Sequence, residues 1–230
     1  MIKKLYVITI LLFILVVFAL VSLDFSTLYN DFGRVYFETN GYIETGSTNL
    51  VTGIYLDYRL FDSLFEAGIL LIAVAGIIWI SKHDLSEKNV EFMFEHFKTP
   101  ELFITFSRII FPLLLMFGIY VIVNGHISPG GGFQGGAIVA TAILILYYID
   151  QDRWTNIKVI VTVEKIVYIL LIIVASISFI TRGVPFTNFI PNTSNINLKV
   201  IYLMILNILI GMKVSLGLWT IFTAFLREGR

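Results

Sequence analysis

Six long apolar segments constrain this chain more than any other feature of its sequence. A helix rises about 1.5 Å per residue, so about 20 apolar residues cross the hydrocarbon core of a bilayer. An open sheet would leave edge groups unsatisfied in lipid, and the roughly ten-residue alternating strands of a membrane barrel are absent. The predicted fold is therefore all-α, a polytopic membrane protein with six transmembrane helices over Leu5–Leu23, Ser63–Ile80, Leu102–Val123, Phe133–Ile149, Val159–Thr181 and Val200–Leu226.

The composition supports a membrane protein and excludes several kinds of site. Hydrophobic residues make up 57% of the 230 residues and charged residues only 14%, against about 25% charged in soluble domains. The net charge of zero gives no reason to expect a nucleic-acid partner. Without cysteine, the chain has no thiolate ligands for iron–sulfur clusters. The histidines His83, His96 and His126 lack metal-site spacing, so we expect no metal site and no cofactor.

The first apolar segment resembles a signal peptide in one respect, because Lys3 and Lys4 precede it. Its apolar run is too long for a cleaved segment, and Phe18–Ser22 is a poor cleavage site. We therefore predict that this segment is retained as a membrane helix.

Loop charges predict the orientation, because lysine and arginine gather on the cytoplasmic side of membrane proteins. Placing both termini in the cytoplasm leaves the acidic loop Asp24–Tyr58 and the segment Asn124–Gly132 outside. The cytoplasmic side then holds Lys3, Lys4, Lys82, Lys88, Lys98, Arg153, Lys158, Arg227 and Arg230, and the outer side Arg34, Arg59, Arg182 and Lys199. The predicted location is the cytoplasmic membrane.

Two blocks are predicted along the chain. Residues 1–90 form a two-helix unit with a long outer loop, and residues 91–230 form a four-helix unit with short connections. Between them, Asp84–Thr99 has a polar start and three phenylalanines, typical of an interfacial helix or a linker.

The stretch Asn124–Ala140 is rich in glycine and lies between two apolar segments. A phosphate-binding G-x-G-x-x-G loop follows a strand and opens a helix, so this apolar context argues against a nucleotide site. Two interpretations remain open. Proline and glycine form a turn followed by a closely packed helix, or unwound backbone lines a hydrated path. The residues concerned are Pro129, Gly130, Gly131, Gly132, Gly135 and Gly136.

The same stretch carries a family resemblance. It reads Asn124-Gly125-His126, then Pro129-Gly130-Gly131-Gly132-Phe133, then Gly135-Gly136. This order is similar to the G-H-x-x-P-G-G-G-F-x-G-G signature of the MnhB/MrpB subunit of Mrp-type multisubunit cation/proton antiporters. Asn207, Ile210-Gly211 and Lys213-Val214 also resemble the end of such subunits. The resemblance implies four helices over residues 91–230, exchange of Na⁺ for H⁺, and other antiporter subunits as partners.

Residues Asn49–Glu66 carry a second resemblance. They are similar to the N-x-V-T-x-I-L-x-D-x-R-x-x-D-T-x-G-E region of the large MrpA subunit, which also occurs as the small E subunit of membrane-bound hydrogenases. Ser63 and Phe65 stand where that pattern has threonine and glycine. The resemblance implies an E-like unit over residues 1–90, fused to the MnhB-like unit.

Charged residues at the second span are candidates for an ion or proton path. Glu66 and Asp62 are four residues apart, so both carboxylates share one helix face, with Asp57 and Arg59 just before them. Ionisable groups in membrane helices usually mark ion paths. The alternatives are an interfacial ion pair and helix cap for Asp57, Arg59 and Asp62, and an interhelix salt bridge for Glu66.

Lys213 lies about 20 Å into the last predicted helix, too deep to reach the surface easily. It pairs with an acid such as Glu164, or with one from a neighbouring subunit, or it sits in a hydrated axis; we favour a role in transport.

His126 is a further candidate for the ion or proton path, either as a proton port or as a cap at a helix end. The secondary candidates are Arg59, Glu164, Lys165 and Arg108. For the last three a position at the membrane surface is favoured.

These observations predict a non-catalytic membrane subunit of a multisubunit Na⁺/H⁺ antiporter module that helps to form the ion path. One alternative places the same module in a membrane-bound hydrogenase or related respiratory complex, with the redox centres on other subunits. The other alternative is a structural scaffold with no ion path.

Overall fold

The computed structural model describes residues 2–25, 31–84, 100–149, 157–183, 186, 188, 190 and 194–228. Over these residues the regular structure is helical throughout, as predicted. The elements are α1 (Ile2–Phe25), α2 (Phe32–Thr45), α3 (Leu50–Gly53), the π-helix η1 (Ile54–Tyr58), α4 (Leu60–Asp84), α5 (Glu101–Val123), α6 (Gly132–Ile149), α7 (Ile157–Arg182) and α8 (Ile196–Glu228).

Five helices are long and apolar enough to cross a membrane, namely α4, α5, α6, α7 and α8. They confirm five of the predicted segments. In α1, the apolar run Ile8–Leu20 is shorter, so a sixth span stays a prediction, as does the side on which the termini lie. The predicted interfacial segment falls mostly on residues 85–99, outside the described residues.

The chain divides into two compact units, Met1–Thr39 and Asn40–Arg230. The second unit contains all five spanning helices, and α4 from the first predicted block packs there against α7 and α8 from the second. The block boundary near residue 90 therefore stays a prediction about the sequence alone.

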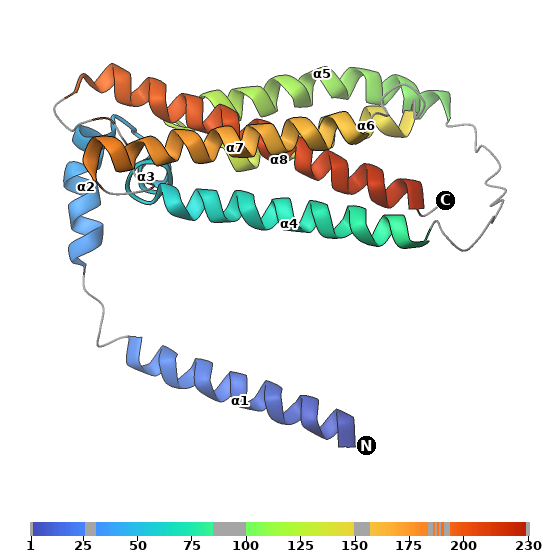
Figure 1. Cartoon of the computed structure of the whole chain (residues 1–230), viewed down its shortest axis with the longest axis horizontal. Coiled ribbons are helices and arrows are strands. Elements are labelled where there is room, and N and C mark those ends of the chain that lie inside the picture. Colours follow the sequence, from blue (N-terminus) through green and yellow to red (C-terminus); the bar gives the residue numbers. More distant parts are fainter. Residues whose placement is uncertain are drawn as a thin grey trace. The chain divides into compact units, whose positions relative to one another are not determined.

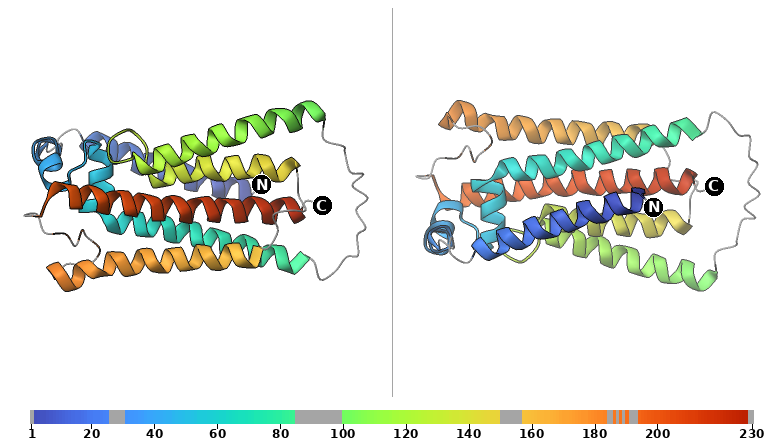
Figure 2. Two further views of the ribbon diagram at one scale, coloured as in Figure 1. Left: turned by 90° about the horizontal axis from the view of Figure 1, so that it is seen from above. Right: turned by 90° about the horizontal axis from the view of Figure 1, so that it is seen from below.

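Helix α8 is the centre of the second unit. It contacts α4, α5, α6 and α7, and half of the residues of its span Ile196–Phe225 are buried. Figure 2 shows α5 and α6 on one side of it and α4 and α7 on the other. In Figure 1, α5 runs along one edge of this bundle and α4 along the other.

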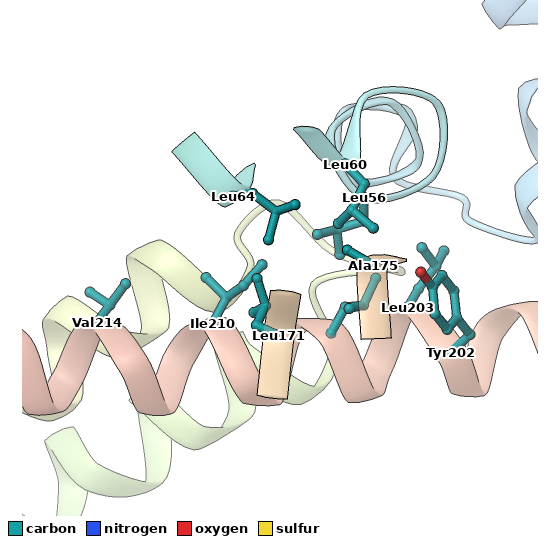
Figure 3. Close-up of a cluster of buried hydrophobic side chains, with 10 residues drawn as sticks. Leu56, Leu60, Leu64, Leu171, Ala175, Tyr202, Leu203, Ile210 and Val214 are labelled. Atoms are coloured by element: carbon teal, nitrogen blue, oxygen red, sulfur yellow. The ribbon is translucent and has the colours of Figure 1, made fainter. Parts of the chain in front are cut away.

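The apolar core of this unit lies where η1, α4, α7 and α8 meet. Figure 3 shows Leu56, Leu60 and Leu64 above Leu171 and Ala175, with side chains of α8 on either side of that pair. Burying a leucine contributes about 1.5–3 kcal/mol in water. Inside a bilayer, close packing rather than that transfer energy holds helices together.

The predicted outer loop Asp24–Tyr58 is not an open loop, because it contains α2, α3 and η1. Gly41 lets α2 approach Leu50 closely, since a Cβ there would lie 2.7 Å from a leucine methyl. The buried Lys199 ammonium donates to the carbonyl of Ile43 at 3.4 Å, near the C-terminus of α2. A cation is favourable at that end of a helix.

Candidate functional site

The two sequence motifs that carry the family resemblances meet at one end of the bundle. The Asn49 side-chain amide donates to the carbonyls of Gly125, at 2.8 Å, and Ser128, at 2.9 Å. The Thr52 hydroxyl donates to the same Gly125 carbonyl at 2.6 Å. We call this junction, residues 47–55 with residues 124–132, the motif clasp.

The clasp continues through the backbone of His126. Its carbonyl accepts from the Ser47 hydroxyl at 2.8 Å and from the Asn49 backbone N–H at 3.1 Å. The His126 ring is buried, with Nδ1 3.2 Å from the Val123 carbonyl. This position fits the predicted cap at the end of α5, whereas a proton port at His126 stays a prediction.

Asn207 ties α8 to both sides of the clasp. Its side-chain oxygen accepts from the Gly132 N–H at 2.9 Å and from the Tyr55 hydroxyl at 3.1 Å. Burial raises the pKa of Tyr55, the Thr52 hydroxyl opposes that rise, and the negative charge of Glu66 adds to it. Tyr55 therefore stays a neutral donor at physiological pH. In the sequence Asn207 was only part of a motif, and no role was predicted for it.

The glycines serve the turn and the helix contacts. Gly130 has φ 136° and Gly131 φ 155°, a region that favours glycine, and a Cβ on Gly131 would collide with the Tyr55 hydroxyl. A Cβ on Gly132 would lie 2.5 Å from the Asn207 carbonyl oxygen, and one on Gly136 would lie 2.7 Å from that of Gly211. The helix α5 precedes the motif where a nucleotide loop would need a strand.

The acids near the start of α4 lie in different environments. Asp57 is 8% exposed within η1. Asp62 is exposed and forms an ion pair of 2.8 Å with Arg59, the arrangement given above as an alternative to ion carriage. Glu66 is exposed one turn further along α4, inside the apolar span Leu60–Ile80. The element η1, which contains Asp57, is a π-helix, and π-helical turns are frequent at functional sites.

A buried ion pair lies inside the bundle. The Lys213 ammonium is 3.2 Å from a Glu164 carboxylate oxygen, and both side chains are 0% exposed. The charges are close enough to attract strongly. Beyond this contact, neither carboxylate oxygen nor the ammonium has a hydrogen-bond partner among the described residues. Lys213 is about 18 Å from the end of the α8 span at Phe225.

The pairing of Lys213 with Glu164 was one of the predicted alternatives, but the favoured surface position of Glu164 is wrong. Glu164 faces α8, where Gly217 leaves room for it: a Cβ on Gly217 would lie 3.0 Å from the carboxylate. The neighbouring Lys165 is exposed, as is Arg108 on α5. The burial of Lys199 was not predicted either, because its place in the sequence suggested only an outer-loop charge.

The structure thus separates the predicted path residues into two groups. Asp62 and Glu66 are exposed on α4, whereas Glu164 and Lys213 are enclosed by the bundle. Within the described part of the chain, no group of three or more histidine, aspartate or glutamate side chains could hold a metal ion.

A family model for a domain related to the MnhB subunit of Na⁺/H⁺ antiporters matches residues 102–220. A Rhizobium meliloti protein, named as the probable A/B component of a K⁺/H⁺ antiporter, is 27% identical over 141 residues, which cover 53% of this chain and 14% of that protein. The stretches matched in the first curated relatives cover between 14% and 55% of those proteins, so the chain spans about half of their length or less.

Two solved structures are similar. A chain of the membrane-bound sulfane sulfur reductase, an archaeal respiratory membrane complex, is 26% identical with a TM-score of 0.70, and the match covers 98% of this chain and 99% of that chain. A chain of the Mrp complex from Dietzia sp. DQ12-45-1b is 24% identical with a TM-score of 0.54, covering 82% of this chain and 23% of that chain. At this lower identity the likeness to the Mrp chain shows the fold alone.

Proposed function

Because the chain belongs to the family of domains related to the MnhB subunit of Na⁺/H⁺ antiporters, we propose that it is a membrane subunit of a multisubunit cation/proton antiporter module. It acts in the cytoplasmic membrane beside other subunits and has no catalytic residues of its own. The family supports Na⁺ as the exchanged cation, whereas the Rhizobium relative is named for K⁺.

The observation that carries this proposal is the position of Glu66. Its side chain is exposed within an apolar span, and no hydrogen bond or ion pair of Glu66 is found among the described residues. An ionisable group facing lipid is costly, so such groups face protein or water. A neighbouring subunit or a hydrated path at this face of α4 removes the cost, and both belong to a multisubunit ion transporter.

Within this proposal the charged groups have different roles. Asp57, Asp62 and Glu66 pass cations or protons along the α4 face towards a neighbouring subunit. Lys213 and Glu164 form an internal charge pair whose electric field acts on that path. The turn at Gly130–Gly136 holds the end of α6 against α8, as the contacts of Gly132 and Gly136 require.

A second candidate function has a specific observation in its favour. The likeness to a chain of an archaeal respiratory complex extends end to end, whereas only 23% of the Mrp chain is matched. In that setting the same module couples redox chemistry to cation or proton pumping. The redox centres would belong to other subunits, because this chain has no cysteine.

Purification from the native membrane decides between the two settings. The chain is tagged and extracted in mild detergent, and all proteins that co-purify with it are identified. Antiporter subunits alone support the stand-alone exchanger, and iron–sulfur subunits support the respiratory complex. Recovery of the chain without any partner contradicts both.

Transport measured in membrane vesicles tests the role of Glu66. We expect Glu66→Gln to lower cation/proton exchange by the complex at least tenfold, because the amide cannot carry a proton or a charge. The matched control is Glu101→Gln, which changes an exposed acid at the start of α5. Equal exchange rates in the wild type and the Glu66 variant would favour the scaffold alternative.

A further inference from the structure

Helices α4 and α7 border a groove of about 550 Å³ at the end of the bundle predicted to face the cytoplasm. On α7 the groove is lined by Lys158 and Lys165, seven residues apart and therefore on one helix face. On α4 it is lined by Leu71, Ile78 and Trp79, also on one face. The α4 wall is thus apolar, and the α7 wall carries the two lysines beside Val161, Thr162 and Glu164.

The charge of this groove is positive. Lys158 and Lys165 are both exposed, and neither has an ion pair among the described residues. Glu164 also lines the groove, but its carboxylate is 0% exposed and is balanced by Lys213 at 3.2 Å. The groove therefore repels cations, which argues against its being part of the cation path. It favours an occupant with a negative charge and an apolar body.

The depth of the charges matches the layers of a bilayer. Lys158 begins the α7 span Lys158–Thr181, and Trp79 is next to the end of the α4 span Leu60–Ile80. Lys165 starts about 10 Å deeper. Side chains lean towards the N-terminus of their helix, and lysine stems extend towards the interface, so the Lys165 ammonium is directed towards the end of the groove where Lys158 lies. Tryptophan is enriched at this level.

We propose that this groove binds an anionic phospholipid. Its phosphate lies between the Lys158 and Lys165 ammonium groups, and one acyl chain runs along Leu71 and Ile78. The Thr162 hydroxyl takes no part as a donor, because it already donates to the Lys158 carbonyl at 2.7 Å. Basic pockets between membrane helices bind acidic headgroups in this way.

The fluorescence of Trp79 reports the occupant directly. The purified complex is reconstituted with brominated phosphatidylglycerol or brominated phosphatidylcholine, and the difference between the wild type and Trp79→Phe isolates the quenching of Trp79. Each of the two lysines is expected to favour the anionic lipid roughly fivefold, so half-maximal quenching should need roughly 25-fold less phosphatidylglycerol than phosphatidylcholine.

Charge variants test the assignment to these lysines. In the double variant Lys158→Gln/Lys165→Gln the preference for phosphatidylglycerol over phosphatidylcholine should disappear, while both lipids still quench Trp79. The control Arg108→Gln removes an exposed cation from α5 and should keep the full preference. Equal quenching by the two lipids in the wild type, or an unchanged preference in the double lysine variant, would overturn the proposal. So would the absence of quenching by either lipid, which would show that a protein partner covers the groove.

Discussion

Replacing one member of the Lys213–Glu164 ion pair should lower the free energy of unfolding far more than replacing both members. Both side chains are fully buried at 3.2 Å, so Lys213→Met leaves a carboxylate enclosed without a countercharge. Breaking a buried pair in this way costs about 3–5 kcal/mol of the free energy of unfolding. Glu164→Leu leaves the ammonium in the same position, and a similar loss is expected.

The double variant Lys213→Met/Glu164→Leu should recover most of that loss. Replacing a buried ion pair by apolar groups of similar volume is often neutral or stabilising, so its stability should lie within about 1 kcal/mol of the wild type. The non-additivity of the two single changes is the signature of direct contact. Denaturant unfolding of the purified chain in detergent measures all four proteins under one condition.

If either single variant loses less than about 1 kcal/mol of the free energy of unfolding, the reasoning is refuted, because the charges would then be solvated rather than enclosed. The same variants separate structure from transport. A double variant that unfolds like the wild type but exchanges no cations would show that the pair acts in transport. Normal exchange would make the pair purely structural.

The clasp and the glycines give three further predictions. Asn49→Ala removes donated bonds of 2.8 and 2.9 Å, so we expect a loss of about 1–3 kcal/mol, read as a lower thermal midpoint. Gly136→Ala should destabilise the chain because its Cβ would lie 2.7 Å from a backbone oxygen, whereas Gly76→Ala meets nothing within 4 Å and should be harmless. Burial raises the pKa of Tyr55 above 10.0, so its stabilising effect is complete below pH 10 and is lost as the pH rises through the raised value. Above pH 10, the free energy of unfolding of Tyr55→Phe should therefore depend less on pH than that of the wild type.

Hydropathy was enough to predict the five spanning helices found among the described residues. The predicted segment Leu102–Val123 corresponds to α5, Glu101–Val123, and Phe133–Ile149 corresponds to α6, Gly132–Ile149. Both predictions end correctly because polar and turn residues bound the apolar runs. The prediction Ser63–Ile80 is shorter than α4, because a helix continues into polar residues wherever its backbone hydrogen bonds persist.

The orientation of each helix about its own axis could not be predicted in the same way. Glu164 and Lys165 are adjacent on one helix, so their side chains point in different directions, but the sequence does not say which one faces the bundle. That choice depends on the room left by Gly217 on another helix and on the countercharge of Lys213. The burial of Lys199 likewise depends on the carbonyl of Ile43, far away in the sequence.

The motif clasp makes a further prediction about the two sequence blocks. Its hydrogen bonds join residues 73 to 79 positions apart, across the predicted boundary at residue 90. If the two blocks descend from separate subunits, the clasp was once an interface between those subunits. Fusion would have made this interface intramolecular. Covalent linkage only raises the effective concentration of the two partners, so the contacts themselves should still hold unlinked halves together. Residues 1–90 and 91–230, expressed together as two chains, should then co-purify in detergent. The change Asn49→Ala together with Thr52→Val should reduce the recovered partner several-fold, whereas Gly76→Ala should not. Halves that never associate, although both insert into the membrane, would contradict this origin of the clasp.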